Sequence, residues 1–160
     1  LIADGYCNAR VIEYAADGTK IRQWGKKGTG PGEFQLVHDV TIAPDGTIFI
    51  ADRENGRLQW FDSDGKFLGQ KHFGGQVFSA QVAANGMVYV GTHARDTSGY
   101  DIDSYIFQFD PRSGKILGRV DGFAHQLTVG PDGSLYPGPV NIKIGHDPKA
   151  TSIVVYRPKK

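Results

Sequence analysis

The sequence predicts an all-β fold, because short alternating runs follow one another and no segment keeps a helical period. The chain has 160 residues, of which 22 are glycine and 39% are hydrophobic. The expected strands include residues 11–14, 47–50, 58–61, 87–90 and 105–109. Turn-forming dipeptides separate them: Asp17-Gly18, Asp45-Gly46, Asp64-Gly65, Asn85-Gly86, Ser113-Gly114 and Asp132-Gly133. In such turns glycine supplies the positive φ that other residues avoid.

An internal repeat organises these strands. The run Ala3-Asp4 to Arg10 returns as Ala51-Asp52 to Arg57, and the two arginines are 47 residues apart. A period in the 40s with four short strands per unit is typical of the blades of a β-propeller. The polar residues of this run bond nearby backbone and hold a bend between strands, so we interpret them as structural.

The later units predict how much of a propeller is present. We expect a third unit over residues 77–120, with an insertion at 92–103, and a fourth over 123–157 with an irregular loop at 137–149. Residues 1–160 would then form one partial propeller domain of about three and a half to four blades. Propellers close with roughly four to eight blades. We therefore expect missing blades or another chain to close the ring, and the absence of an initiator Met fits a piece of a longer protein.

Composition excludes several classes of partner. The net charge is +1, so nothing indicates nucleic acid, and no apolar run approaches the roughly 20 residues that span a membrane. Cys7 is the only cysteine, which excludes an internal disulfide. By default a single cysteine is a small buried residue, and the alternative is a disulfide partner in a missing upstream segment.

Two histidines occupy the same place in the repeat. His38 and His125 each lie seven residues before an Asp-Gly turn, at the start of the strand expected nearest the propeller axis. Phe78 takes this position in the unit between them, so the histidines lie on alternate blades. Alternate blades of a six-bladed ring give three positions, and three histidines with one open position form a catalytic zinc site. The alternative is that one or both are partly buried histidines bonded to the backbone.

Two further polar side chains are candidates for chemistry. Tyr6 and Arg53 follow the two Ala-Asp pairs, which predicts that they lie on loops at one end of neighbouring blades. A phenol beside a cation ionises more easily and can act as a base. The other histidines, His72 near a strand end and His93 and His146 in loops, are expected to be surface residues.

These motifs together resemble one family. The runs 4–10 and 51–57, with Gln23-Trp24-Gly25, Pro31-Gly32-Glu33-Phe34 and His38 in the same order, resemble the peptidyl-α-hydroxyglycine α-amidating lyase domain. The resemblance covers most of residues 1–136. It implies a six-bladed NHL-type propeller that cleaves a peptidyl-α-hydroxyglycine to a peptide amide and glyoxylate.

The resemblance also implies roles for single residues. Tyr6 matches the catalytic tyrosine, Arg53 an active-site arginine, and His38 and His125 two of three zinc ligands; the third histidine and a further arginine would lie in upstream blades. Cys7 matches a cysteine whose disulfide partner would also lie upstream, in keeping with an extracellular or periplasmic location.

The sequence departs from the family pattern at several positions, and the resemblance fades after Tyr136. Gln126 replaces an aspartate that helps to bind a structural calcium, which leaves calcium doubtful. Phe123 replaces a methionine near the last zinc ligand, and Phe49 and Trp60 replace a second disulfide. These changes fit a distant bacterial-type relative and leave its natural substrate open.

Two functions follow from the sequence. The first is a zinc-dependent carbon–nitrogen lyase in the complete protein, acting on a peptide or small-molecule substrate, with Tyr6 as base and Arg53 stabilising negative charge. The second is a non-catalytic NHL-repeat propeller that binds a protein, peptide or glycan, for which the insertion with Tyr100 and Tyr105 would be a recognition loop.

Overall fold

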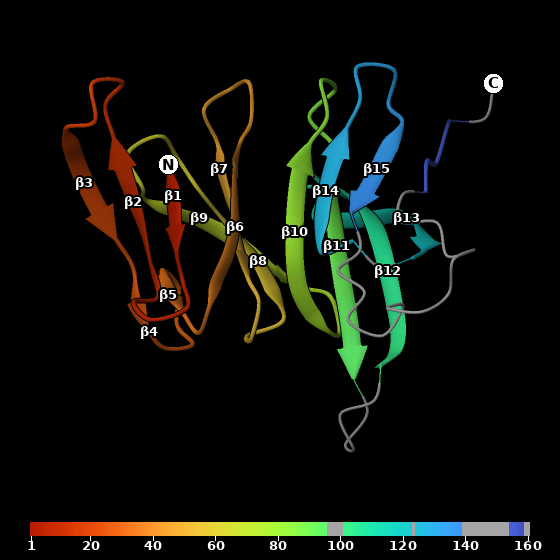
Figure 1. The fold of residues 1–160 in the computed structure, drawn as a ribbon, viewed down its shortest axis with the longest axis horizontal. Helices are drawn as coiled ribbons and strands as arrows, with labels where there is room; N and C mark the ends of the chain where they lie inside the picture. Colours follow the sequence, from red (N-terminus) through yellow and green to blue (C-terminus); the bar gives the residue numbers. More distant parts are fainter. Residues whose placement is uncertain (96–100, 123, 139–153, 159–160) are drawn as a thin grey trace, which may run out of the picture.

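The computed structural model describes residues 1–95, 101–122, 124–138 and 154–158, and within these ranges it is all β (Figure 1). Four antiparallel sheets follow one another in chain order, and a short parallel pair connects the first two. The sheets are the blades of an open, partial propeller, as the sequence predicts. No helix in the described ranges is long and apolar enough to cross a membrane.

Each blade is a meander whose strands pair in chain order. Blade 1 contains β1 (Ile2–Asp4), β2 (Arg10–Tyr14) and β3 (Lys20–Trp24). The connector to the next blade contains β4 (Lys26–Lys27) and β5 (Glu33–Phe34). Blade 2 contains β6 (Val37–Ile42), β7 (Ile48–Asp52), β8 (Arg57–Phe61) and β9 (Phe67–His72). Blade 3 contains β10 (Gln76–Val82), β11 (Val88–Arg95), β12 (Asp101–Asp110) and β13 (Lys115–Asp121). Blade 4 contains β14 (Gln126–Val129) and β15 (Leu135–Gly138), and a single bridge joins Leu135 to Tyr156.

Strands contain most of the expected insertion and the first two residues of the expected irregular loop. Residues 92–95 continue β11 and residues 101–103 begin β12, so one long hairpin replaces most of the insertion; residues 96–100 lie outside the described ranges. Pro137 and Gly138 belong to β15, and residues 139–149 also lie outside. The pairing of these two strands runs from Val88 opposite Phe109 to Arg95 opposite Asp101.

Apolar side chains fill the spaces between neighbouring blades. Val11, Phe34, Ile50 and Phe61 are buried between blades 1 and 2, and a second cluster around Phe109 lies between blades 2 and 3. The innermost strands β6, β10 and β14 contact one another in series around the axis. These three strands therefore lie side by side.

The turn dipeptides behave as the sequence predicts. The glycines of all six have positive φ, between 69° and 87°. Asp17, Asp45 and Asp132 each accept a hydrogen bond from the backbone N–H two residues later. These bonds favour the carboxylate and lower the pKa of all three groups.

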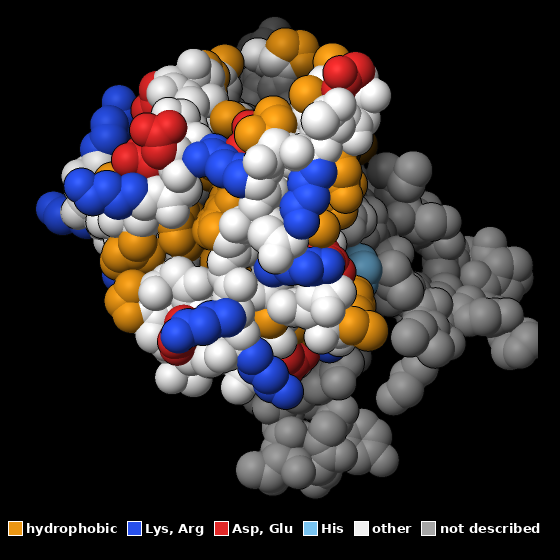
Figure 2. All heavy atoms as spheres, turned by 90° about the vertical axis from the view of Figure 1, so that its left-hand side faces the viewer, with side chains coloured by type: hydrophobic (Ala, Val, Ile, Leu, Met, Phe, Trp, Pro, Cys, Tyr) orange, Lys and Arg blue, Asp and Glu red, His pale blue; other side chains and the backbone are white. Residues whose placement is uncertain are grey.

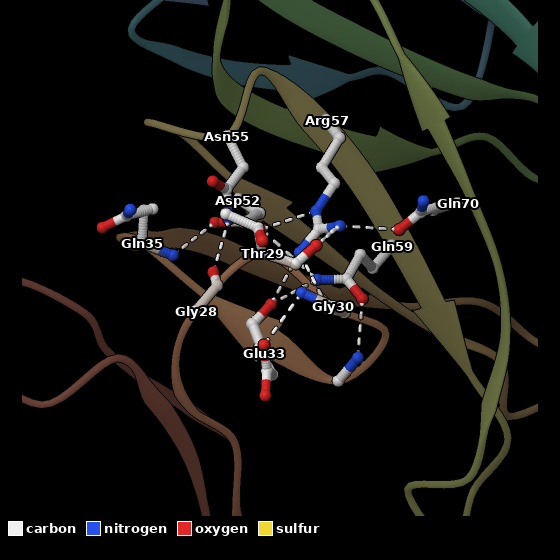
Figure 3. A network of polar contacts seen from close by, with 11 residues as sticks. Gly28, Thr29, Gly30, Glu33, Gln35, Asp52, Asn55, Arg57, Gln59 and Gln70 are labelled. Atoms are coloured by element: carbon white, nitrogen blue, oxygen red, sulfur yellow. Dashed lines mark hydrogen bonds and ion pairs between the residues drawn. The ribbon is translucent and has the colours of Figure 1, made fainter.

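The Arg57 guanidinium is the most highly bonded buried group of blade 2 (Figure 3). Its Nε donates to Asp52 at 2.8 Å. Its four other N–H groups donate to Gln70 and to three connector carbonyls, those of Thr29, Gly30 and Glu33. An arginine has five N–H donors, and here each has an acceptor. Arg57 therefore ties the connector to the β7–β8 loop.

We expect Arg57→Ala to lower the free energy of unfolding by about 3–5 kcal/mol, because it leaves a buried carboxylate without its cation. Arg10 is the matched control, since it pairs with Asp4 at 2.7 Å in the same motif but with side chains 31% and 26% exposed. Arg10→Ala should cost about 1 kcal/mol or less. Urea denaturation of both variants measures this, and equal losses would contradict the assignment.

The turn carboxylates predict a pH dependence. Their folded-state pKa values lie below the unfolded value of about 3.9, so their contribution to stability is complete above that pH and is lost as the pH falls. Asp45→Asn keeps the acceptor oxygen but cannot titrate, so its unfolding free energy should depend less steeply on pH below about 4. Asp64→Asn is the control, because the Asp64 carboxylate accepts no hydrogen bond from the described residues. Identical slopes for wild type and Asp45→Asn would refute this reading.

Candidate functional site

The innermost strands β6 and β10 each carry a β-bulge at the same place. The pairing of β6 with β7 skips His38, and the pairing of β10 with β11 skips Phe78. A bulged residue leaves the strict alternation of a strand, so its side chain is redirected. His125 takes the corresponding position directly before β14. All three rings therefore lie at one end of the inner strands.

Side chains next to these positions tie the inner strands together. Asp39 accepts a hydrogen bond from the backbone N–H of Ala80 at 3.0 Å, which joins β6 to β10. Ser79 donates to the carbonyl of Ala124 at 2.9 Å, which joins β10 to the start of blade 4. Burial raises the pKa of Asp39, and its backbone hydrogen bonds oppose the rise. These bonds fix the inner strands relative to one another, and so place the three rings side by side.

The two imidazoles lie against each other and against Phe78. The ring centroids of His38 and His125 are 4.8 Å apart, and Phe78 is 5.0 Å from the first and 5.3 Å from the second. His38 Nδ1 lies 2.6 Å from the carbonyl oxygen of Phe78. A carbonyl only accepts, so Nδ1 carries the proton and Nε2 keeps its lone pair. This is the arrangement that orients a histidine for metal binding.

Both histidines favour the neutral form. Burial is the largest cause that lowers the pKa of His38; the hydrogen bond to Phe78 opposes it, and the charges of His125 and Arg53 add to it. Burial also lowers the pKa of His125, and Arg53 contributes. Neutral imidazole is the form that binds a metal.

Tyr6 and Arg53 meet beside the histidines. Arg53 Nη1 donates to the Tyr6 hydroxyl at 3.2 Å, and the Tyr6 ring lies 6.1 Å from that of His38. The guanidinium lies over the Phe78 ring at 5.0 Å. Tyr6 is 72% exposed. The structure thus brings all four residues predicted from the sequence to one end of the blades.

Two further residues lie beside this site, and one of them, His93, was predicted to lie elsewhere. The prediction that His93 is a surface loop residue is wrong: it is 5% exposed on β11, it contacts Ser104 Oγ at 2.8 Å, and its ring lies 5.9 Å from Phe78. It is buried because β11 continues past residue 92. The sequence identified Phe78 only as the residue at the histidine position of the intervening blade. Like the two histidines, it lies seven residues before a turn dipeptide, and this spacing was the signal that its ring would lie beside theirs.

The remaining candidates are Cys7, two histidines and two tyrosines. Cys7 is exposed in the β1–β2 loop, so the default expectation of a buried residue is wrong. His72 is exposed, as predicted, while His146 and Tyr100 lie outside the described ranges. Tyr105 is a strand residue of β12, and Arg119 lies over its ring at 4.0 Å. Among the described residues there is no group of three or more His, Cys, Asp or Glu side chains that could hold a metal.

Comparison with known sequences matches residues 34–61 to the NHL repeat. The chain is 34% identical over 152 residues to peptidyl-glycine alpha-amidating monooxygenase A of Xenopus laevis, which covers 86% of this chain and 16% of that protein. It is 38% identical over 91 residues to peptidyl-alpha-hydroxyglycine alpha-amidating lyase 1 of Drosophila melanogaster, covering 49% of this chain and 17% of that protein. The resemblance noted in the sequence is thereby confirmed, and the chain spans about a sixth of these relatives.

Comparison with solved structures supports the fold. The WD40 β-propeller domain of Doa1 matches with a TM-score of 0.57 at 12% identity, over 82% of this chain and 44% of that chain. At this identity the match shows a likeness of fold.

The paired imidazoles lead to a prediction for zinc. We expect His38→Ala and His125→Ala each to weaken zinc binding at least about 10-fold. Even the mutation of a residue that only hydrogen-bonds to a metal ligand lowers metal affinity about 10- to 100-fold. Competition with a chromophoric chelator measures the affinity. His72→Ala removes an exposed imidazole on β9 and should leave it unchanged. Equal affinity in all three variants would exclude a site at the pair.

Proposed function

We propose that this chain, an NHL-repeat relative of the peptidylglycine α-amidating enzymes, carries part of the site of a zinc-dependent lyase. The complete protein would cleave a peptidyl-α-hydroxyglycine to a peptide amide and glyoxylate. The observation that carries the proposal is the meeting of two paired imidazoles with the Arg53–Tyr6 hydrogen bond at one end of three neighbouring inner strands. Four residues from four separate segments converge there.

The residues present suit zinc as two of its ligands. His38 has Nδ1 occupied by a carbonyl, so Nε2 is the nitrogen available to a metal, and burial favours neutral rings. Zinc, when bound, would supply Lewis-acid chemistry at the substrate hydroxyl oxygen. A third ligand would come from another blade of the same ring. Gln126 is neutral and exposed, so calcium is not included in the proposal.

Tyr6 is the group placed to handle the proton. In this reaction the hydroxyl O–H electron pair forms the C=O bond of glyoxylate, the C–N bond breaks, and the amide nitrogen takes a proton. The reaction therefore needs one proton removed from oxygen and one delivered to nitrogen. The Tyr6 hydroxyl, as phenolate, would accept the first proton, and the same group can return it.

Arg53 supports the charge that this step creates. Its Nη1 donates to the Tyr6 hydroxyl, so the cation lies beside the oxygen on which negative charge would form. The packing of the guanidinium on Phe78 limits its movement. Arg53 thus acts as a preorganised cation.

A further blade is proposed to cover blade 1. Ile2 and Tyr14 occupy the repeat positions of Ile50 and Phe61, which in blade 2 pack against the preceding blade. Ile2 is 51% exposed, and apolar side chains lie among charged ones on this side of the molecule (Figure 2). The partner would be the missing blades of the same protein or another chain. A location outside the cytoplasm, where exposed Cys7 could find a disulfide partner, belongs to the same proposal.

Tyr6→Phe tests the chemistry. It removes the hydroxyl that accepts the proton, so kcat/KM should fall by about 10²- to 10⁴-fold. The measurement is glyoxylate release from a hydroxyglycine-capped peptide by the zinc-supplied full-length protein. Tyr136→Phe removes a hydroxyl from a 40% exposed ring on β15 and should leave the rate unchanged.

Two outcomes would count against the proposal. No glyoxylate release with zinc supplied would overturn the substrate assignment. If stoichiometric zinc were also missing, the alternative function, a propeller that binds a protein, peptide or glycan, would be favoured.

A further inference from the structure

The backbone of Arg53 is held at the beginning of the β7–β8 loop. Its N–H donates to the carbonyl of Leu36 at 2.9 Å, and the preceding residue, Asp52, belongs to the buried Arg57 network. These bonds fix the point from which the side chain leaves the loop. They do not fix the direction of the guanidinium, because a long side chain has several rotatable bonds.

Glu54 supplies the contact that directs the guanidinium. Its Oε1 accepts the Arg53 Nε–H at 2.8 Å, and the Arg53 and Glu54 side chains are 19% and 38% exposed. A guanidinium is a rigid plane, so fixing Nε on one edge sets where the Nη atoms point. In this orientation Nη1 reaches the Tyr6 hydroxyl.

Glu54 is itself anchored from the next blade. Gln76, at the start of β10, donates from Nε2 to Glu54 Oε2 at 2.8 Å. A carboxylate only accepts, so the amide nitrogen of Gln76 must face it. The two carboxylate oxygens of Glu54 therefore have different partners. Oε1 accepts from Arg53 of blade 2, and Oε2 accepts from Gln76 of blade 3.

We propose that Glu54 and Gln76 form a positioning pair that fixes the Arg53 guanidinium against Tyr6 for the proton transfer. This rests on the proposed function, and it adds two residues from neighbouring blades to the site. Through this pair, the orientation of the Arg53 guanidinium depends on the packing of blade 2 against blade 3. Glu54 contacts Arg53 directly and Gln76 contacts Glu54, so the pair reaches Tyr6 through Arg53.

A double-mutant cycle on the full-length protein tests the role. Glu54→Ala should lower kcat by about 10- to 100-fold, as expected for a misplaced group. Glu54→Gln should retain most of the wild-type kcat, because its carboxamide oxygen still accepts the Nε–H. Gln76→Leu should cause a smaller loss than Glu54→Ala. In the Arg53→Ala background, Glu54→Ala should have no further effect, because the pair acts only through Arg53. An equal loss in both backgrounds would overturn the positioning role.

A second readout does not depend on turnover. The Arg53 Nε–H resonance, observed by NMR with ¹⁵N-labelled arginine, should exchange slowly with water in the wild type and faster in Glu54→Ala. Glu13→Ala is the matched control, because it removes the Glu13–Arg22 ion pair on blade 1 and should affect Arg22 alone. An unchanged Arg53 resonance in Glu54→Ala would overturn the positioning pair. Lack of glyoxylate release by the wild type, with a protected Arg53 resonance, would instead overturn the proposed lyase function.

Discussion

The buried guanidinium of Arg57 is the interaction on which the arrangement of the site depends. It bonds three carbonyls of the connector that leads into β6. It also bonds Asp52, which is the residue directly before Arg53. The start of the inner strand and the β7–β8 loop are therefore held by one group. Such a charge is costly to bury unless every donor is satisfied, and here all five N–H groups have acceptors.

Repetition made most of the fold predictable. Alternating runs and Asp-Gly turns predict strands and hairpins from local physics, and all six turn glycines have the expected positive φ. The hairpin of β11 and β12 could not be bounded in this way, because its ends are set by cross-strand pairing rather than by turn residues. The same pairing buries His93, whose neighbours in the chain look like loop residues.

The sequence could identify the residues of the candidate site that follow from the repeat, but it could not show the contacts between them. Equal spacing from the next turn places His38, Phe78 and His125 at one register, since equivalent residues of a repeat occupy equivalent positions. The bulges that aim the first two rings depend on how each inner strand pairs with its neighbour, and no residue pattern marked them. The Glu54–Gln76 contact joins residues of two blades, so only packing reveals it.

The exposure of the four residues shows how the rest of the proposed ring would act. His38 and His125 are partly shielded by Phe78, whereas Tyr6 is 72% exposed. A phenolate in bulk water is screened, and its attraction to a cation is weak there. In the proposed enzyme, further blades would have to exclude water from the Tyr6 side, so that the Arg53 hydrogen bond acts in a lower dielectric. Closing the ring would then complete the proposed metal ligands and strengthen the interaction between Arg53 and Tyr6 by the same step.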